Sequence, residues 1–422
     1  MLNREVIENI LNNAKSVDKD LEVFGAGKHK YQLNPVTTLE KVHEFEKKYG
    51  LTLPEAYVTF LTQIGNGGAG PDYGLYSLEQ VEAWNRDWLN QNTEKQPFID
   101  EKMTAAKWKL VMDETDELED DEKYEEIMSD IYAGILVIGT KGCTYDNILM
   151  CKGSERGKIV YFDWNLEGGC PPYLTGMNFE DWYMNYFKEI AAGYNVYQYG
   201  YYYLGNEEEL MNQYKNSDLI EQKKKCVTSF SRFKKLSPDT IDFLINIKEK
   251  EMNDIRLWLL LKYSSEHGII LFEKFLAGED EMAAVERAGM LPKEKKDKFY
   301  QPMLRLLYQE NKVDKLRILF FLKDCSGSCA GDVLAYAMNT DNPEDVRKTA
   351  VYVMGKCPDA EEYIDEFIML MKDKSYWVAH AALQGTISAG LDSTELTECY
   401  RWMAQQYADD STMQKNLALV ID

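Results

Sequence analysis

The sequence is short of basic residues and of histidine. It has 48 Lys and Arg against 71 Asp and Glu, four histidines, and a formal net charge of −23 over 422 residues. A chain this acidic is repelled by nucleic acid and by anionic lipid, and it attracts basic partners. The composition therefore predicts no nucleic-acid partner and no membrane partner.

Long apolar runs are also missing. A helix needs about 20 predominantly apolar residues to cross a bilayer, and IRLWLLL at 255–261 is among the longest runs here. The N-terminal MLNREVIENILNN mixes both signs of charge and has no apolar core, unlike a secretory signal. We expect a soluble, cytoplasmic protein.

Signatures of catalysis and metal binding are missing as well. None of the four histidines has a metal-binding spacing, and no G-x-S-x-G elbow or phosphate loop occurs. The eight cysteines have no framework spacing, which favours reduced, mostly buried thiols. Cys325 and Cys329 in CSGSC lack a second ligand pair, and Cys143 lacks a nearby histidine. We expect no enzyme, no cofactor and no metal.

A glycine-rich stretch, QIGNGGAGPDYGLYSL at 63–78, contains the spacing G-x-G-x-x-G. A dinucleotide-binding loop with this spacing needs a strand before it and a helix after it. Here a helical apolar pattern over 53–64 comes before the glycines, and Pro71 starts an extended pattern after them. The helix end facing the loop is a C-terminus, whose negative partial charge repels phosphate. We expect a turn that follows a helix.

Residues 31–190 predict a mixed α and β module. Two helical patterns come first, with capping-box spacings at Thr37 and Thr52. Three β-rich runs follow at 134–140, 146–153 and 159–165, and the last two are joined by a Gly-bounded turn that indicates a hairpin. A helical pattern over 178–193 closes the module.

An acidic stretch interrupts this module. DETDELEDDEKYEEIMSD at 113–130 carries eleven acids and one basic residue, Lys123. A solvated loop or helix face is the favoured interpretation, and a surface for a basic partner is the alternative. A calcium loop needs a central Gly, which this stretch lacks.

In this order, the elements resemble the SUKH superfamily. The resemblance rests on a turn after a helix pair, a hairpin turn and a closing helix, carried by Asn66-Gly67, Gly153-x-Glu155-x-Gly157 and Phe179-x-x-Trp182. It covers about 31–190, and the acidic insert is longer than the family pattern. The resemblance implies an α+β domain with a twisted sheet flanked by helices. It also implies non-enzymatic binding, as in bacterial immunity proteins that neutralise toxins, often nucleases, or in eukaryotic interaction hubs of cell-wall signalling.

Between the modules lies GYNVYQYGYYYLGNEEEL, residues 193–210, which holds six tyrosines. A strand or packed ribbon is the favoured interpretation, and an exposed adhesive patch is the alternative. The predicted domain organisation is an N-terminal helical extension at 1–30, a SUKH-like domain at 31–195, a Tyr-rich joint at 196–222 and helical repeats at 223–422.

Residues 223–422 predict an all-α domain. Five helical segments align on positions 255, 282, 316, 346 and 378, and three of them place an arginine next, at Arg256, Arg317 and Arg347. Gly355 and Gly385 are expected to close two of the helices. The pattern resembles degenerate HEAT-like repeats, which implies a protein-binding scaffold, and an irregular helical bundle is the alternative. The balance of 28 basic and 32 acidic residues here argues against nucleic acid, and it leaves 20 basic and 39 acidic residues in 1–222.

We therefore predict a non-enzymatic protein-binding protein, an immunity protein that neutralises a basic toxin domain such as a nuclease. The alternative is an intracellular interaction scaffold or regulator without a toxin. Acidic and aromatic residues of the insert and the hairpin are the candidate contacts: Asp116, Glu117, Asp120, Asp121, Asp146, Glu155, Asp163 and Trp164. Trp164 can equally belong to the core. The sequence does not determine the oligomeric state.

Overall fold

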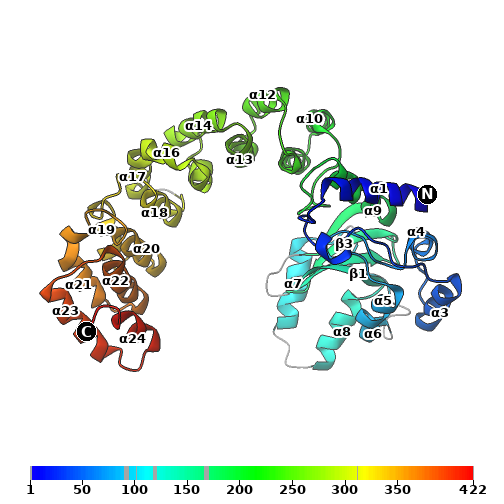
Figure 1. Cartoon of the computed structure of the whole chain (residues 1–422), viewed down its shortest axis with the longest axis horizontal. Coiled ribbons are helices and arrows are strands. Elements are labelled where there is room, and N and C mark those ends of the chain that lie inside the picture. Colours follow the sequence, from blue (N-terminus) through cyan, green and yellow to red (C-terminus); the bar gives the residue numbers. More distant parts are fainter. Residues whose placement is uncertain are drawn as a thin grey trace. The chain divides into compact units, whose positions relative to one another are not determined.

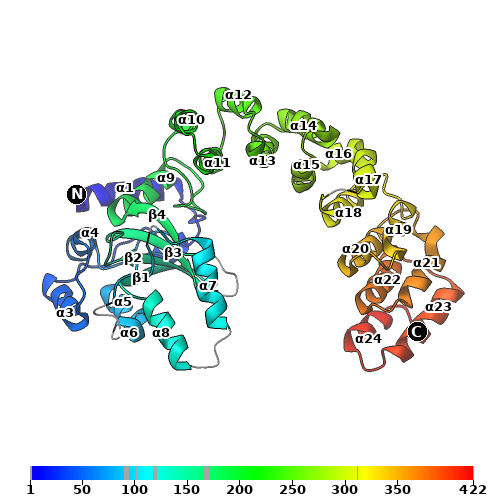
Figure 2. The same ribbon diagram turned by 180° about the vertical axis from the view of Figure 1, so that it is seen from behind.

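The computed structural model describes residues 2–89, 95–100, 102–116, 121–165, 171–310 and 312–421, without the side chains of Glu114, Asp116 and Asp121. The chain divides into two compact units. The first comprises Met1–Asn206 with Ser229–Lys234, and the second comprises Glu207–Thr228 with Lys235–Asp422. Figures 1 and 2 label their elements. The first unit is α+β and the second is all-α, which confirms the predicted fold class.

The first unit is built on one antiparallel sheet with the strand order β1-β2-β3-β4. The strands are β1 (Ile135–Gly142), β2 (Tyr145–Met150), β3 (Lys158–Asp163) and β4 (Tyr173–Asn178). The helices are α1 (Arg4–Val17), α2 (Ala26–His29), α3 (Leu39–Tyr49), α4 (Glu55–Thr59), α5 (Leu78–Trp84), α6 (Arg86–Leu89), α7 (Ala105–Asp116), α8 (Asp121–Ile131) and α9 (Phe179–Ala191). A single π-helical turn, Phe60–Ile64, extends α4 to Gly65.

Both faces of the sheet are buried because helices cover each of them. Leu136 and Ile138 of β1 join one core with side chains of α9, and α1 packs on the outside of α9. The intervening Ile135 and Val137 point to the opposite face and join a second core with α7 and α8. The described parts of the acidic stretch, 113–116 and 121–130, therefore belong to two helices whose apolar side chains cover a sheet face. Asp113 and the acids at 122, 125, 126 and 130 are exposed.

Two expected helix caps are wrong by one or two residues. The hydroxyl of Thr38, rather than that of Thr37, accepts the hydrogen bond of the Lys41 amide at the start of α3. Thr37 is buried instead, and its amide binds the Leu61 carbonyl at 3.0 Å. Pro54 precedes α4 without a side-chain cap, so Thr52 has no capping role there.

The glycine-rich stretch covers the free edge of β1. Amides of the loop bind β1 carbonyls, from Tyr73 to Thr140 at 3.2 Å and from Tyr76 to Ile138 at 2.9 Å. Gly74 has a φ of 95°, and a Cβ there would lie 2.3 Å from the Gly68 carbonyl oxygen. The loop thus needs glycine to lie this close, and it protects an edge strand that would otherwise expose unpaired backbone groups.

The second unit consists of helices. They are α10 (Glu207–Asn216), α11 (Ile220–Ser229), α12 (Pro238–Asn246), α13 (Asn253–Tyr263), α14 (Ser265–Lys274), α15 (Glu281–Arg287), α16 (Lys293–Lys296), α17 (Tyr300–Tyr308), α18 (Lys315–Lys323), α19 (Gly331–Met338), α20 (Glu344–Met354), α21 (Ile364–Met371), α22 (Tyr376–Ala389), α23 (Thr394–Gln406) and α24 (Ser411–Leu417).

Hydrogen bonds at a recurring sequence separation link neighbouring helix pairs. Asp297 accepts from the Ser326 amide, Asp359 accepts from the Ala330 amide, and Ser375 donates to Glu344, at separations of 29, 29 and 31 residues. A structural repeat of about 30 residues produces such a series because each unit contacts the next in the same way. The second unit is therefore consistent with a helical repeat domain.

A basic side chain near the start of a helix repeatedly caps the preceding helix. Arg256 donates to the Ile247 carbonyl at 2.7 Å, Lys315 to the Leu307 carbonyl at 2.9 Å, and Arg347 to the Ala337 carbonyl at 3.1 Å. These carbonyls lie at helix C-termini, which lack intrahelical partners and carry negative partial charge. Arg317 does not take this role; it is exposed and pairs with Glu286.

The expectation for Gly385 is wrong. Gly355 follows the last residue of α20, as expected, but Gly385 lies inside α22. A Cβ on Gly355 would lie 2.5 Å from the Gly385 Cα, and a Cβ on Gly385 would lie 2.9 Å from the Phe367 ring. The two glycines allow α20 and α22 to approach closely, so packing rather than helix termination explains Gly385.

Candidate functional site

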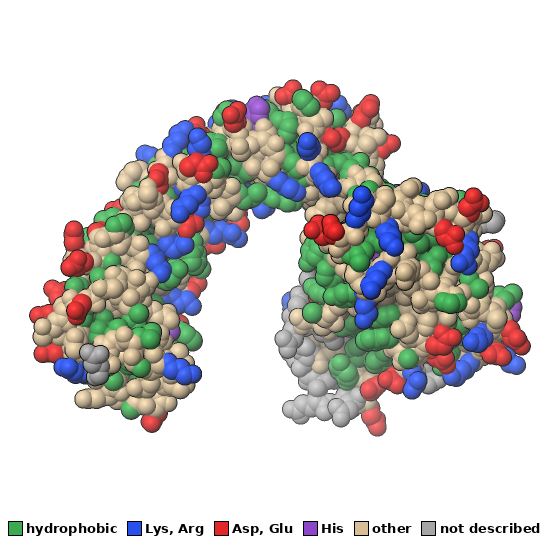
Figure 3. Space-filling model, in the orientation of Figure 1, with side chains coloured by type: hydrophobic (Ala, Val, Ile, Leu, Met, Phe, Trp, Pro, Cys, Tyr) green, Lys and Arg blue, Asp and Glu red, His purple; other side chains and the backbone are tan. Residues whose placement is uncertain are grey.

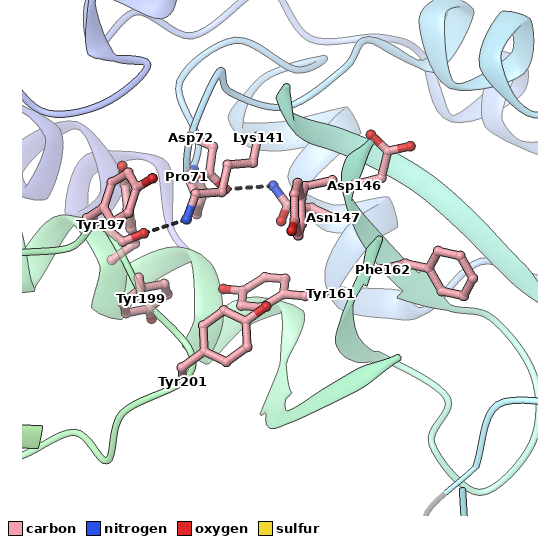
Figure 4. Close-up of a pocket in the computed structure, with 12 residues that line it drawn as sticks. Pro71, Asp72, Lys141, Asp146, Asn147, Tyr161, Phe162, Tyr197, Tyr199 and Tyr201 are labelled. Atoms are coloured by element: carbon pink, nitrogen blue, oxygen red, sulfur yellow. Dashed lines mark hydrogen bonds between the residues drawn. The ribbon is translucent and has the colours of Figure 1, made fainter. Parts of the chain in front are cut away.

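Aromatic side chains from segments far apart in the sequence form a groove on the first unit. We call it the tyrosine groove; it has a volume of about 640 Å³ and is lined by Phe24, Tyr73, Lys141, Gly142, Cys143, Tyr145, Tyr197, Gln198 and Tyr201. A narrower pocket adjoins it and shares Lys141, Tyr145, Tyr197 and Tyr201 (Figure 4). The glycine-rich loop supplies Tyr73, the first residue of β2 is Tyr145, and the segment after α9 supplies Tyr197 and Tyr201.

Lys141 fastens the tyrosine-rich segment to the sheet. Its ammonium group donates to the Tyr197 carbonyl at 2.5 Å and lies 4.4 Å from the centroid of the Tyr197 ring. No strand forms in the described residues 193–206, so the strand is wrong and the packed ribbon is what remains of the favoured interpretation. Gly200 and Gly205 interrupt the segment with φ values of 88° and 117°, which β-strand residues do not adopt.

The floor of the pocket is polar. Asn147 donates to Asp72 at 3.2 Å, as Figure 4 shows. Burial raises the pKa of Asp72, while the nearby charge of Lys141 and the Asn147 hydrogen bond act in the opposite direction. The Trp182 indole donates to the Tyr161 hydroxyl at 2.8 Å, and burial raises the pKa of Tyr161 well above its usual range. The floor thus combines one carboxylate and one ammonium with neutral phenols, a set suited to hydrogen bonding.

The rim of the groove exposes large aromatic rings. Tyr197 is 57% exposed and Tyr145 is 47% exposed, whereas Tyr199 of the same segment is buried. Trp84, also largely exposed, stacks on Tyr76 at 5.8 Å with an interplanar angle of 5° beside an adjoining hollow. Exposed aromatic clusters of this kind mark protein–protein contact sites, where tyrosine and tryptophan are enriched.

Three of the predicted contact residues meet at one end of the β2–β3 hairpin. Asp146 is buried and accepts from the Trp164 indole at 2.8 Å, and its side chain points away from the pocket (Figure 4). Trp164 is half-buried and stacks on Tyr132 at 4.5 Å. Asp163 accepts from the Thr144 hydroxyl at 2.5 Å.

The surroundings of Asp146 and Asp163 shift the pKa values of the two side chains in opposite directions. Burial raises the pKa of Asp146, against hydrogen bonds from Thr140 and Trp164. Burial acts to raise the pKa of Asp163 too, but hydrogen bonds from Thr144 and Asn165 together hold it below its usual value. Asp163 therefore stays charged at a half-exposed position.

Glu155, another of the predicted contacts, lies away from this cluster. Glu155 is buried at the opposite end of the hairpin and pairs with Lys158 at 2.8 Å. The side chains of Asp116 and Asp121, and all of Glu117 and Asp120, lie outside the described part of the chain. Sequence reasoning missed Tyr73, Tyr145 and Tyr161; the one available signal was the tyrosine-rich segment 193–210, whose alternative interpretation was an exposed patch.

Residues 37–185 match the model of the SMI1 / KNR4 family (SUKH-1). The chain contains a SUKH-1 domain. The SUKH-1 domain spans α3 to most of α9 and supplies Tyr73, Tyr145 and Tyr161, while Phe24, Tyr197 and Tyr201 come from segments that flank it. The tyrosine groove is thus completed by flanking sequence. No curated protein matches the chain.

No helix in the described ranges is both long and apolar enough to cross a membrane. Within those same ranges, no group of three or more His, Cys, Asp or Glu side chains is arranged to hold a metal ion.

Proposed function

We propose that the chain is a non-enzymatic protein-binding protein of the immunity type, which neutralises a basic bacterial toxin domain, such as a nuclease, by docking it on the first unit. The observation that carries the proposal is the tyrosine groove, an exposed aromatic surface on a SUKH-1 domain. Such rings act as binding anchors because they bury a large area at a small cost in side-chain entropy.

The acidic charge of residues 1–222 supports a basic partner. Residues 1–222 carry 39 acidic and 20 basic residues. Complementary charge accelerates encounter and excludes wrong partners, while the buried anchors hold the complex together. In the proposed complex the aromatic rim forms the centre of the contact, and acidic side chains surround it.

We assign the acidic part of the contact to the candidate residues that the sequence predicted. Asp163 and Trp164 are half-exposed and available to a partner. Asp146 and Glu155 are buried, so their contribution is the local field rather than direct contact. The insert residues Asp116, Glu117, Asp120 and Asp121 complete the proposed set.

The test is co-expression of the full chain with a basic toxin domain encoded beside its gene, followed by calorimetric titration. We expect growth rescue, and the double variant Tyr145→Ala/Tyr197→Ala should weaken binding by about 30- to 1000-fold, since each of the two anchors contributes roughly 1–2 kcal/mol. The control is Leu39→Ala, which removes an exposed apolar side chain from α3, outside the groove lining. Absence of rescue and of binding would refute the immunity proposal.

A scaffold or regulator without a toxin is the second candidate. The helical repeat unit favours it, because stacked repeats offer extended binding surfaces independent of the SUKH-1 domain. Recovery of a partner that binds the second unit and has no toxic activity would support the scaffold over the immunity protein.

A further inference from the structure

Three helices of the second unit, α18, α20 and α22, each expose an aromatic ring. Phe320 of α18 is 48% exposed, Tyr352 of α20 is 40% exposed and Trp377 of α22 is 53% exposed. The Phe320 and Tyr352 ring centroids are 6.4 Å apart, and Lys348 of α20 lies 5.9 Å from the Trp377 ring. Each ring belongs to a different helix, so the stacking of the repeats creates the row.

Basic side chains accompany these rings. Lys356 lies 5.7 Å from the Tyr352 centroid and donates to the Ser388 hydroxyl. The structure thus gives Lys348 an aromatic ring, and Lys356 a ring and a hydroxyl, as partners rather than carboxylates. A lysine with such partners keeps its positive charge available to an incoming anion.

Ion pairs link α18 to α15, and α15 to α13. Arg317 of α18 pairs with Glu286 at 3.1 Å. Arg287 of α15 binds Asp254 of α13 at 2.6 Å and lies 5.8 Å from the Trp258 ring. The row from α13 to α22, which we call the cation–aromatic face, therefore has paired charges at its α13 end and lysines on aromatic rings at its α20–α22 end. Figures 1 and 2 both place α13, α18, α20 and α22 along one side of the helical unit, and Figure 2 shows α15 on the same side. Figure 3 shows Lys and Arg side chains beside hydrophobic ones on the helical unit.

We propose that the α18–α22 part of this face binds an extended acidic segment of a partner protein, with the carboxylates on Lys348 and Lys356 and the apolar side chains on Phe320, Tyr352 and Trp377. Charge complementarity selects the acidic occupant. The exposed rings supply apolar anchors, and rows of stacked repeats suit extended segments.

Nucleic acid fits this surface less well. The repeats as a whole have 28 basic and 32 acidic residues, and Arg287 and Arg317 are already engaged by carboxylates. Phosphate binding needs several unpaired cations along a track, because each neutralised phosphate adds to affinity through counterion release. The proposal is independent of the function proposed for the SUKH-1 domain.

The test uses fluorescence anisotropy of the full chain with three labelled probes: a peptide of alternating Glu and Phe, its Lys and Phe counterpart, and a single-stranded DNA oligonucleotide. We expect the Glu and Phe peptide to bind, with an affinity that added salt lowers. The other two probes should bind at least about tenfold more weakly. Lys348→Glu/Lys356→Glu and, separately, Trp377→Ala should each reduce its affinity by about tenfold or more.

The control is Lys293→Glu/Lys295→Glu on α16, which makes the same change of charge at two exposed lysines off the face. Circular dichroism verifies that each variant is folded. The proposal is overturned if the acidic peptide does not bind, if the α16 control weakens binding as much as the face variants, or if DNA binds more tightly than the peptide. Trp377→Ala keeps the test decisive if the charge reversal alone disturbs folding.

Discussion

The close approach of α20 and α22 predicts that Gly355→Ala destabilises the helical unit. The new methyl carbon would lie 2.5 Å from the Gly385 Cα and 2.9 Å from its carbonyl oxygen, well inside the 3.5–4.0 Å at which carbon atoms pack. Gly355 has a φ of −69°, which alanine adopts freely, so the backbone conformation does not oppose the substitution. The two helices must separate, or α22 must bend.

The expected cost follows from this geometry. Inserting a methyl group into a packed contact costs about 1–3 kcal/mol, and the better helix propensity of alanine offsets roughly 0.5–1 kcal/mol. A net loss of about 1–2 kcal/mol corresponds to a Tm decrease of roughly 2–8 °C for a unit of this size. Hydrogen exchange measured peptide by peptide is the better assay, because a chain of two units need not unfold in one step.

We expect amides of α20 and α22 to exchange roughly 5- to 30-fold faster in Gly355→Ala. The matched control is Gly289→Ala, whose Cβ would meet no heavy atom within 4 Å, and it should leave exchange unchanged or slower. If Gly355→Ala exchanges like the control, the glycine contact does not hold these helices together, and the account of Gly385 as a packing residue fails.

Two further predictions concern buried charge. Burial lowers the pKa of His29 to about 4, against the opposing effect of Asp18. In the unfolded chain the His pKa is near 6.5, so as the pH falls the unfolded state binds a proton before the folded state does. The free energy of unfolding should therefore fall by about 3 kcal/mol between pH 6.5 and pH 4. His29→Gln should flatten the unfolding free energy over this window, and an unchanged slope would contradict the assignment. In the second unit, Arg347→Met should cost about 3–5 kcal/mol in urea unfolding, since it strands the Asp373 carboxylate, whereas Arg347→Met/Asp373→Leu should recover much of that loss. A double variant no better than the single one would show that the Arg347 bond to the Ala337 carbonyl, not the ion pair, dominates.

Local patterns predicted much of the first unit because its elements are specified by nearby residues. The structure shows this local control at two helix ends: Gly50 ends α3 with a φ of 56°, and Ser77 caps α5 in a full capping box with Gln80. The hairpin and the closing helix also lie where alternation and helical period place them. The predicted cap of α3 was wrong because two candidate side chains, Thr37 and Thr38, are adjacent. Only the path of the incoming chain decides which of the two hydroxyls reaches the helix amides.

The sequence by itself determined the fold class, three of the four strands, the closing helix of the first unit, the acidic charge of the first half and the approximate repeat of the second; it missed β4. These properties follow from residue type and short spacings. Tertiary structure alone decided that Tyr73, Tyr145 and Tyr197 line one groove, that Asp146 points away from it, and that Gly385 packs rather than terminates a helix. Such facts depend on which residues far apart in the chain approach each other, and no local propensity specifies that distance.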